Sequence, residues 1–454
     1  MGEVSEIRRK MEELYTRAVE AKHIDTGEIQ RELEPLFQKY GYREQKEDGL
    51  QRILLYHDDG VGDFINCSPA IRAVRQAFPK AQITLLVHVR ARDLALTCPY
   101  VDQIFVDEQK CDRHEPLGLL RWYIDFSQKL LPMRFDVCIN FIAWGSSVLL
   151  SYLCGAARRV DYDPSGFECS GPYPYNTVSN FVTDYVPCKL RGIHSIYRYL
   201  PLAEYLTGQE IEDCHPELWV LAVEKERWQK KLQQQAEAAK WIAVVLGGTD
   251  ARHHWPVQNY AQLLKLIIEE DRASSPHFLI LGGSENQADG DALVKKLPEH
   301  RAWNLAGKLI YRESIAALSC CCMYVGNDTG LLHAAAAAGL PVLSPCCYAA
   351  DLPMGINAVP IKQFPYGVPS VLVRPAHALD ICKSSKSDWG CIQLGEAHCI
   401  AQISPELMLE GYRFLENLVQ QGRNERFFLY ETENPAHQGK ATSFQSYSNI
   451  VFQS

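Results

Sequence analysis

Short buried strands alternate with amphipathic helices along most of this chain, and the alternation runs twice. The first run begins at residue 52, where an apolar strand is followed by a helix and by a second strand over 82–88. The second run begins with a strand over 241–246. Strands that alternate with helices favour a parallel, doubly wound sheet. We therefore predict an α/β protein with two tandem Rossmann-like domains.

The polarity of the remaining segments predicts where these domains begin and end. A polar, proline-bearing linker places the first domain over 50–210 and the second over 211–402. Residues 1–49 carry apolar positions at helical spacing between charges, which predicts a helical extension that packs on the main body or on a partner. Residues 403–421 predict a helix that packs back toward the first domain. The tail, 422–454, shows no periodicity.

Composition and charge exclude several classes of protein. Hydrophobic residues at 47% and charged residues at 22% are typical of a soluble globular chain. A net charge of -9 without a stripe of Lys and Arg argues against nucleic acid as a partner. No apolar run is long enough to span a membrane. Because the 16 cysteines come without a secretion signal, we predict a cytoplasmic protein that makes at most transient membrane contact.

The stretch 325–342, VGNDTGLLHAAAAAGLPV, gives the strongest indication of chemistry. It predicts a buried strand, a polar turn and a helix of small residues. The N-terminus of such a helix presents backbone N–H groups and a positive dipole end, which suit a phosphate. Thr329 adds a hydroxyl, Gly330 permits close backbone approach, and His333 lies about one turn further on. The alternative is that Asp328 only caps the helix and His333 only fills the core.

Two further glycine turns follow strands of the same predicted sheet. Residues 246–256, LGGTDARHHWP, combine two glycines with the Thr249 hydroxyl and with the positive charges of Arg252 and His253. After the next strand, a second Gly-Gly pair leads to Glu285, which is placed to accept hydrogen bonds from ribose hydroxyls. Taken alone, each turn is explained as a structural connection between a strand and a helix, without any ligand. Three such turns at one sheet edge predict a nucleotide diphosphate site.

In the first domain, an acidic loop follows the opening strand. Its last residue, Asp63, precedes a helix predicted over 69–78, where it would cap that helix or act as a general base toward an acceptor hydroxyl. Asp58 and Asp59 are interpreted as loop carboxylates. A second group of side chains in this domain follows a strand and consists of His88, Arg90 and Arg92. We predict that these residues either hold an anionic acceptor or form a solvated loop.

These segments, in this order, resemble glycosyltransferase family 9, the ADP-heptose:lipopolysaccharide heptosyltransferases. The resemblance covers about residues 50–421. It rests on Gly62-Asp63, on Trp255-Pro256, on Gly283-Ser-Glu285 and, most strongly, on Asp328-Thr-Gly-Leu-Leu-His333. It implies a GT-B fold, in which two Rossmann-like domains face a central cleft. It also implies an inverting, metal-independent transfer of heptose from an ADP-activated donor to an acceptor hydroxyl.

The resemblance implies a role for each matched residue. Asp63 matches the catalytic base. The implied donor contacts are Thr329 and Gly330 for the diphosphate, Asp328 and His333 for the sugar, Glu285 for the ribose and the backbone of 308–312 for adenine. Where the family usually has a phosphate-binding Lys, this chain has His253 with Arg252 beside it. No cofactor and no metal are expected.

Other functions stay open at this stage. The chain could be a GT-B transferase or an epimerase that uses another nucleotide sugar. It could also be a non-catalytic, nucleotide-sugar-binding assembly module, with the N-terminal helices as the surface of a homo-oligomer. The acceptor is a glycan, a lipid-linked molecule or another hydroxyl compound.

A group of three cysteines lies near the end of the second domain, at Cys382, Cys391 and Cys399. Their spacings of nine and eight do not match the tight pairs of a metal knuckle. We predict no metal there, although the sequence alone does not decide the point.

Overall fold

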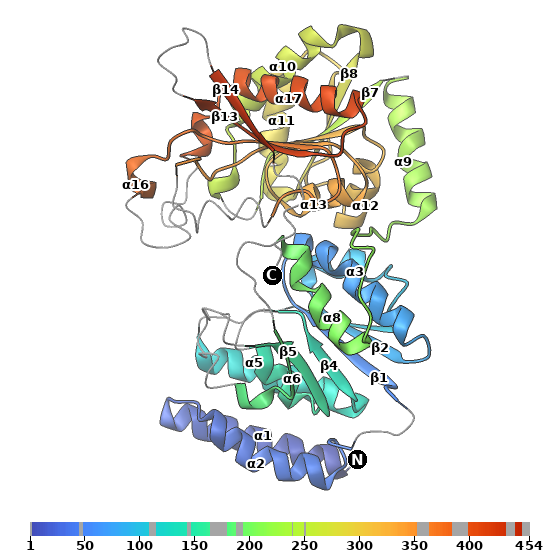
Figure 1. The fold of residues 1–454 in the computed structure, drawn as a ribbon, viewed down its shortest axis with the longest axis vertical. Coiled ribbons are helices and arrows are strands. Elements are labelled where there is room, and N and C mark those ends of the chain that lie inside the picture. Colours follow the sequence, from blue (N-terminus) through green and yellow to red (C-terminus); the bar gives the residue numbers. More distant parts are fainter. Residues whose placement is uncertain are drawn as a thin grey trace. The chain divides into compact units, whose positions relative to one another are not determined.

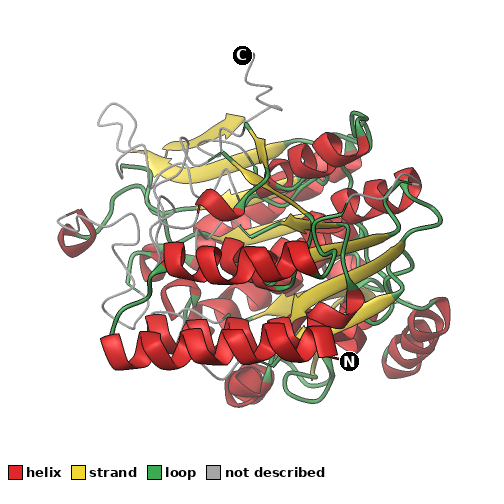
Figure 2. Ribbon diagram, turned by 90° about the horizontal axis from the view of Figure 1, so that it is seen from below, coloured by secondary structure: helices red, strands yellow, loops and turns green. Residues whose placement is uncertain are grey.

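The computed structural model describes residues 2–44, 49–108, 115–142, 147–163, 179–187, 194–237, 239–248, 251–351, 363–383, 398–432 and 441–446. The chain forms two compact units, Met1–Cys214 and His215–Ser454, and each contains one sheet (Figure 1). This division lies close to the boundary predicted after residue 210. Viewed from below, helices accompany the strands of both sheets (Figure 2).

The sheet of the first unit is parallel throughout, in the order β3-β2-β1-β4-β5-β6. In register, Tyr56 of β1 lies beside Leu86 of β2 and Asn140 of β4. This is the strand order of a Rossmann fold, whose ligands bind where the order reverses, at the carboxyl ends of β1 and β4. The strands are β1 (Arg52–His57), β2 (Gln82–His88), β3 (Gln103–Asp107), β4 (Val137–Asn140), β5 (Arg158–Tyr162) and β6 (Asp184–Val186).

Helices cover both faces of this sheet. α3 packs against α8 on one face, and α5 packs against α6 on the other (Figure 1). The helices are α3 (Val61–Ala77), α4 (Arg92–Ala95), α5 (Pro116–Leu130), α6 (Ser147–Leu153) and α8 (Leu200–Thr207). Short 3-10 turns are η1 (Val89–Ala91), η2 (Leu131–Met133), η4 (Ser179–Phe181) and η5 (Ser195–Arg198).

Helix α3 begins eight positions before the start that Pro69 suggested, so Asp63 lies in its first turn and not in a loop. Two effects explain the difference. Phe64 and Ile65 are buried in the core, and such tertiary burial overrides local propensity. A proline also cannot donate to the carbonyl four residues earlier. Here the Ser68 hydroxyl donates to that carbonyl, of Ile65, at 2.6 Å.

The predicted helical extension is present as α1 (Gly2–Ala21) and α2 (Thr26–Lys39), which lie side by side against the first unit (Figure 1). Their apolar stripes join one core with α5 and α6. The buried residues of the two stripes are Ile7, Met11, Leu14, Ala18, Ile29, Leu33 and Phe37. The extension is therefore part of the first domain's core and not a separate arm.

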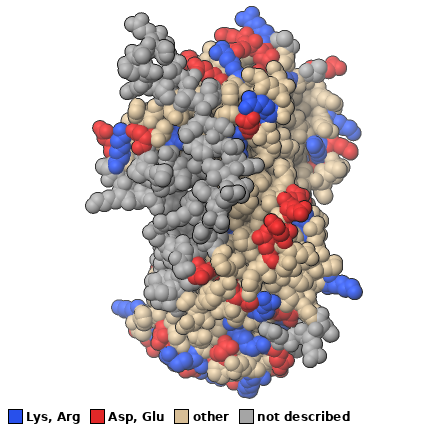
Figure 3. Space-filling model, viewed as in Figure 1, with Lys and Arg blue, Asp and Glu red and all other residues tan. Residues whose placement is uncertain are grey.

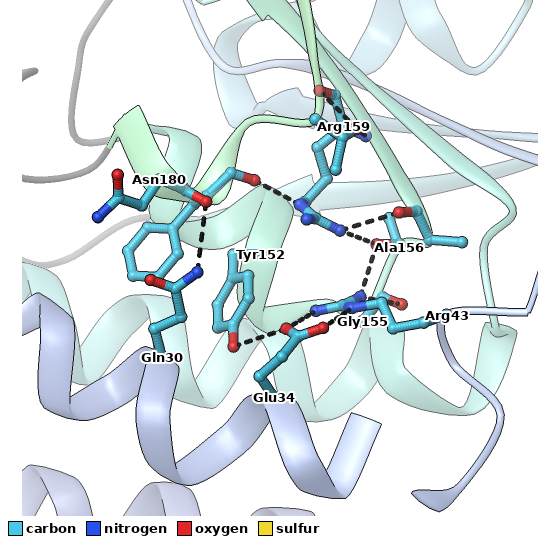
Figure 4. A network of polar contacts seen from close by, with 11 residues as sticks. Gln30, Glu34, Arg43, Tyr152, Gly155, Ala156, Arg159 and Asn180 are labelled. Atoms are coloured by element: carbon cyan, nitrogen blue, oxygen red, sulfur yellow. Dashed lines mark hydrogen bonds and ion pairs between the residues drawn. The ribbon is translucent and has the colours of Figure 1, made fainter. Parts of the chain in front are cut away.

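A polar network fixes α2 to the first domain (Figure 4). Glu34 of α2 accepts from the Arg43 Nε at 3.0 Å and from the Tyr152 hydroxyl of α6 at 3.1 Å. The same Arg43 donates to the carbonyl oxygens of Gly155 and Ala156. Because one guanidinium bonds both a carboxylate and two backbone carbonyls, it links the extension to the end of α6 with little freedom of movement.

The second sheet has the order β14-β13-β12-β11-β10-β7-β8-β9, and β7 to β13 are parallel. Within it, the six strands β7 to β12 lie in the order β9-β8-β7-β10-β11-β12, which repeats the Rossmann order. The order reverses between β7 and β10. The strands are β7 (Lys240–Val245), β8 (Pro276–Leu281), β9 (Ala302–Asn304), β10 (Met323–Gly326), β11 (Val342–Pro345), β12 (Ser370–Val373), β13 (Arg426–Thr432) and β14 (Ala441–Ser446).

Two layers of helices enclose the second sheet. α10, α11 and α17 share a core with one face, and α12 packs with α13 on the other (Figure 1). The helices are α9 (Ala222–Gln235), α10 (Val257–Glu270), α11 (Gln287–Lys296), α12 (Tyr311–Leu318), α13 (Gly330–Ala337), α16 (Asp380–Lys383) and α17 (Pro405–Gln420). The 3-10 turns are η6 (Ala251–His253), η7 (Arg272–Ser274), η8 (Ser284–Asn286) and η10 (Ile400–Gln402).

The end of the chain differs from expectation in two ways. The apolar face of α17, expected to pack back toward the first domain, is buried against β11 and β12 of its own unit. Gly411 permits this close packing, because a Cβ there would lie 2.9 Å from a methyl group of Leu343. The tail also adds strands to the sheet: β13 continues it in parallel and β14 pairs with β13 antiparallel.

None of the helices in the described ranges is long and apolar enough to cross a membrane. On the face drawn in Figure 3, the acidic and basic side chains are interspersed.

Candidate functional site

Three predicted glycine turns meet at one edge of the second sheet. The neighbouring strands β10, β7 and β8 end at Gly326, Val245 and Leu281, and the turns with Asp328, Gly247 and Gly282 follow them. Because these strands are parallel, their carboxyl ends lie at the same edge. The turns also flank the reversal between β7 and β10, where Rossmann sheets bind ligands. Of the remaining predicted residues, Thr249 lies outside the described ranges.

Asn327, which the sequence analysis did not single out, connects these turns. It is fully buried. Its side-chain oxygen accepts from the Trp255 backbone N–H at 3.1 Å and from the Tyr260 hydroxyl at 2.8 Å, and its amide donates to the Leu246 carbonyl. One amide thus joins the end of β7, the start of α10 and the end of β10. Hydrogen-bonded polar groups of this kind give a buried region a single arrangement.

The shape of the first glycine turn depends on Asn286 of η8. A Cβ at Gly247 would lie 1.8 Å from the Asn286 side-chain nitrogen, so only glycine leaves room for this buried amide. The same side chain lies against Gly282, where a Cβ would be 2.7 Å from its oxygen. Asn286 therefore packs the β7 and β8 turns together. Glu285, next to it, is exposed at this edge.

The turn after β10 contradicts the alternative in which Asp328 only caps the helix. Thr329, and not Asp328, is the N-cap of α13: its Oγ1 accepts from the Leu331 N–H at 3.1 Å. Gly330 is the first residue of the helix. The Asp328 carboxylate is consequently not used as the cap. It lies 3.9 Å from the Nδ1 of His253, which comes from the β7 turn.

A pocket with an empty volume of about 310 Å³, including space open to solvent, lies beside this pair. Asp328 and His253 line it together with Cys347 and Tyr348, which follow β11. The Arg252 guanidinium lies 5.8 Å from the Tyr348 ring centroid, and the His253 ring lies 6.1 Å from it. The pocket lining therefore combines the Asp328 carboxylate, the His253 imidazole and the Tyr348 ring, and Arg252 lies near that ring. The sequence analysis missed Cys347 and Tyr348 because it predicted no strand before them.

His333 and the loop 308–312 are placed as follows. His333 is buried on α13, and burial lowers the pKa of its imidazole to about 4, so it is neutral near pH 7. In the loop, the Lys308 ammonium donates to the Asn304 carbonyl at 2.8 Å, and Arg312 pairs with Glu224 of α9 at 3.0 Å. Lys308 and Arg312 are thus both held by the protein itself, and Arg312 belongs to α12 and not to a loop.

In the first unit, Asp63 lies at the carboxyl end of β1, beside the strand-order reversal. Burial raises the pKa of Asp63 to about 7, and the negative charge of Asp59 adds to this effect. The positive charge of Arg198 opposes it, as does the Tyr199 hydroxyl, which donates to Oδ1 at 3.2 Å. A carboxyl group with such a pKa exchanges protons near neutral pH, as a general base must.

Arg198 and Tyr199 are functional candidates that the sequence analysis missed. They come from η5 and the residue before α8, more than 130 positions after Asp63, and no motif marks them. Arg198 also pairs with Asp59 at 3.5 Å. Asp59 is therefore an ion-paired residue near Asp63 and not merely a solvated loop carboxylate. Nearby, burial lowers the pKa of His57 to about 4, which leaves this side chain neutral.

The weaker acceptor candidates lie at the end of β2. The His88 ring accepts from the Arg90 backbone N–H at 3.2 Å and so caps η1. Arg90 and Arg92 are both exposed. An acceptor contact by these three residues remains a prediction.

Comparison with known proteins identifies the family. The model of glycosyltransferase family 9 (heptosyltransferase) matches residues 124–353, which is 230 of 454 positions. The chain belongs to glycosyltransferase family 9. It is therefore a glycosyltransferase, as the sequence predicted, and the match includes the described turns after β7, β8 and β10.

Individual relatives agree with this assignment. The lipooligosaccharide heptosyltransferase 2 of Haemophilus ducreyi is 23% identical over 307 residues, which cover 64% of this chain and 81% of that protein. Among solved structures, the E. coli ADP-heptose lipopolysaccharide heptosyltransferase II matches with a TM-score of 0.58 at 18% identity, over 82% of this chain and 100% of that one. A family 9 glycosyl transferase from Veillonella parvula matches with a TM-score of 0.60 at 18% identity, over 80% and 97%. These structural matches confirm the predicted fold of two Rossmann-like domains.

We expect Asn327→Ala to destabilise the second domain by roughly 2–5 kcal/mol, because it leaves the Trp255 N–H and the Leu246 carbonyl without their partner in the interior. Tyr260→Phe, which removes one hydrogen bond to the same oxygen, is the matched control and should cost about 1 kcal/mol. Chemical denaturation of both variants measures the difference. Equal losses would show that Asn327 does not connect the turns.

Proposed function

We propose that this family 9 enzyme transfers a heptose-like sugar from an ADP-activated donor to an acceptor hydroxyl, with inversion at the anomeric carbon. In this proposal the second domain binds the donor and Asp63 of the first domain is the general base. The observation that carries it is the position of the partly buried Asp63 carboxyl beside the strand-order reversal, where the Tyr199 hydroxyl donates to its Oδ1 at 3.2 Å and its pKa is raised to about 7. The names of the E. coli and Haemophilus ducreyi relatives support ADP-heptose as the donor and a lipopolysaccharide-type acceptor.

The proposed chemical step needs one proton transfer and one substitution. The Asp63 carboxylate accepts the proton of the acceptor hydroxyl while that oxygen attacks the anomeric carbon. The bond from this carbon to the diphosphate breaks on the opposite face, which inverts the configuration. The Tyr199 hydroxyl holds Oδ1 of Asp63 by a hydrogen bond and leaves Oδ2 to receive the proton. A base whose pKa is near the working pH is efficient in such a transfer.

Donor binding is assigned to the edge of the second sheet. The Gly247 turn and the N-terminus of α13 at Gly330 offer backbone N–H groups to the diphosphate. Arg252 and His253 supply positive charge beside them. The sugar is assigned to Asp328 and His333 and the ribose to Glu285, with Thr249 as a further diphosphate contact.

We include no metal ion in this chemical step. Negative charge develops on the leaving diphosphate and requires stabilisation in the transition state. The guanidinium of Arg252, the imidazole of His253 and the dipole of α13 are the groups that we propose for this role. Asp328, which directly precedes the N-cap of α13, lies 3.9 Å from His253 and is assigned to the sugar.

Asp63→Asn is expected to lower turnover by ~10²–10⁴-fold, because the amide cannot accept a proton, and to leave ADP binding intact. In the wild type, kcat/KM should rise as the pH increases through about 7, since only the ionised carboxylate acts. Tyr199→Phe removes a hydrogen bond that lowers the pKa, so this limb should shift to higher pH. Asp289→Asn, at an exposed carboxylate of α11, is the control. Near-normal turnover of Asp63→Asn would move the base elsewhere, with Asp59 the next candidate.

Two variants should divide the donor site by ligand. Glu285→Ala is expected to weaken the binding of both ADP and ADP-sugar, because both contain the ribose. Asp328→Ala is expected to weaken ADP-sugar and hardly to change ADP. Calorimetry with both ligands measures this, and Glu299→Ala, at a side chain that is 88% exposed, is the control. The same loss for both ligands in both variants would contradict the assignment.

The metal-free step predicts activity in the presence of excess EDTA. It also predicts a severe loss of turnover when Arg252→Ala is combined with His253→Ala, since both positive groups near the diphosphate are removed. Thermal unfolding of the double variant shows whether it is folded. The assay is product analysis with the donor alone and with donor plus acceptor, which also detects an epimerase. Activity that disappears with EDTA and returns with Mg²⁺ or Mn²⁺ would rule out the metal-free step.

A further inference from the structure

Three metal-ligating side chains gather away from the proposed donor residues, between α16 and α17. Cys382 lies in α16, and Cys399 is the N-cap of η10, just before α17. Their Sγ atoms are 3.1 Å apart, and the Nδ1 of His398 is 3.3 Å from the Sγ of Cys382. One ligand atom from each of the three residues lies within 4.8 Å of the others. His398 was missed by the sequence analysis, which considered only cysteines.

The environment of this cluster is apolar. Cys382 and Cys399 are 3% and 1% exposed and belong to the core of the second domain. The Nε2 of His398 is buried and has no hydrogen-bond partner among the described residues. Its Nδ1 accepts from the Cys399 backbone N–H at 3.0 Å and lies 3.3 Å from the Sγ of Cys382.

Cys382 and Cys399 are free thiols and not a disulfide. The separation of 3.1 Å between the sulfur atoms is well beyond a disulfide bond of about 2.05 Å. Two thiolates with an imidazole form a ligand set that zinc prefers in proteins. Two thiolate charges also balance one divalent cation, so the site would be neutral in the core. Neither thiolate could be buried there alone without a large desolvation cost.

We propose that Cys382, His398 and Cys399 bind a structural ion of the Zn²⁺ class. Binding replaces two S–H bonds by two metal–sulfur bonds and releases two protons to solvent, with no change of oxidation state. The imidazole coordinates through Nδ1 in place of its hydrogen bond from Cys399. Cys391, the other cysteine of this group, lies outside the described residues.

The ion would fix the start of α17. Its ligands at positions 382 and 399 are 17 residues apart, and α17 begins soon after the second of them. In the segment between Cys399 and α17, the Ile403 carbonyl accepts from the Trp255 indole N–H at 3.0 Å. The Trp255 backbone N–H in turn donates to the Asn327 side chain. The cluster is therefore linked through Ile403 and Trp255 to the turns at the sheet edge, although it contains none of the proposed donor ligands.

The test is the metal content of the full chain, produced in zinc-supplemented medium without a polyhistidine tag and dialysed against a weak chelator. The wild type should retain about one zinc ion per chain. Cys382→Ser, Cys399→Ser and the double variant should retain close to none. Cys322→Ser, at an exposed cysteine of the same unit, is the matched control and should keep the wild-type content.

A second measurement covers the case in which the variants fold poorly. Removal of zinc from the wild type with a strong chelator should lower its unfolding temperature, and Zn²⁺ should restore it where Mg²⁺ does not. Cobalt added to the zinc-free wild type should give the visible absorption of a thiolate-bound ion. A wild type without zinc, full zinc retention in the double variant, or a Cys382–Cys399 disulfide found by mass spectrometry would overturn the proposal. None of these results depends on transferase activity.

Discussion

The arrangement of the second domain's ligand edge depends on the buried amide of Asn327. A parallel sheet brings strand ends to one edge, but it does not determine how the turns after those strands are oriented. Asn327 does so by accepting from Trp255 and Tyr260 and donating to Leu246. These bonds lie in the interior, where an unmade hydrogen bond costs about 1–3 kcal/mol. These bonds therefore favour one arrangement of the turns.

The two sheets use the same topological position for opposite electrostatic purposes. At the edge of the second sheet, backbone N–H groups, Arg252 and His253 favour an anion. At the edge of the first sheet, burial and Asp59 disfavour the charge of Asp63, and Arg198 with Tyr199 restores part of its stability. Burial alone would keep the carboxyl protonated at neutral pH, and full ion pairing would make it too weak a base. The balance of these effects gives a pKa of about 7.

The sequence predicted those features that depend on local pattern. Apolar strands followed by glycine turns placed β7, β8 and β10 and therefore the residues of the proposed donor edge. Features that depend on distant residues escaped it. Nothing near Asp63 in sequence indicates Tyr199, and nothing near Gly247 indicates that Asn286 fills the space beside it. The strand β13 was missed for a different reason: its buried run, Phe427 to Leu429, is too short to show a period.

The position of the N-terminal helices limits how copies of this chain could associate. The apolar stripes of α1 and α2 are already buried in the first domain, so the remaining faces of these helices are mainly charged. Their exposed side chains are largely engaged in ion pairs, such as Lys10 with Glu32 and Arg17 with Glu28. Contacts between such faces are weak and are screened by salt. A homo-oligomer formed through these helices would therefore depend on charge complementarity and not on a shared hydrophobic core.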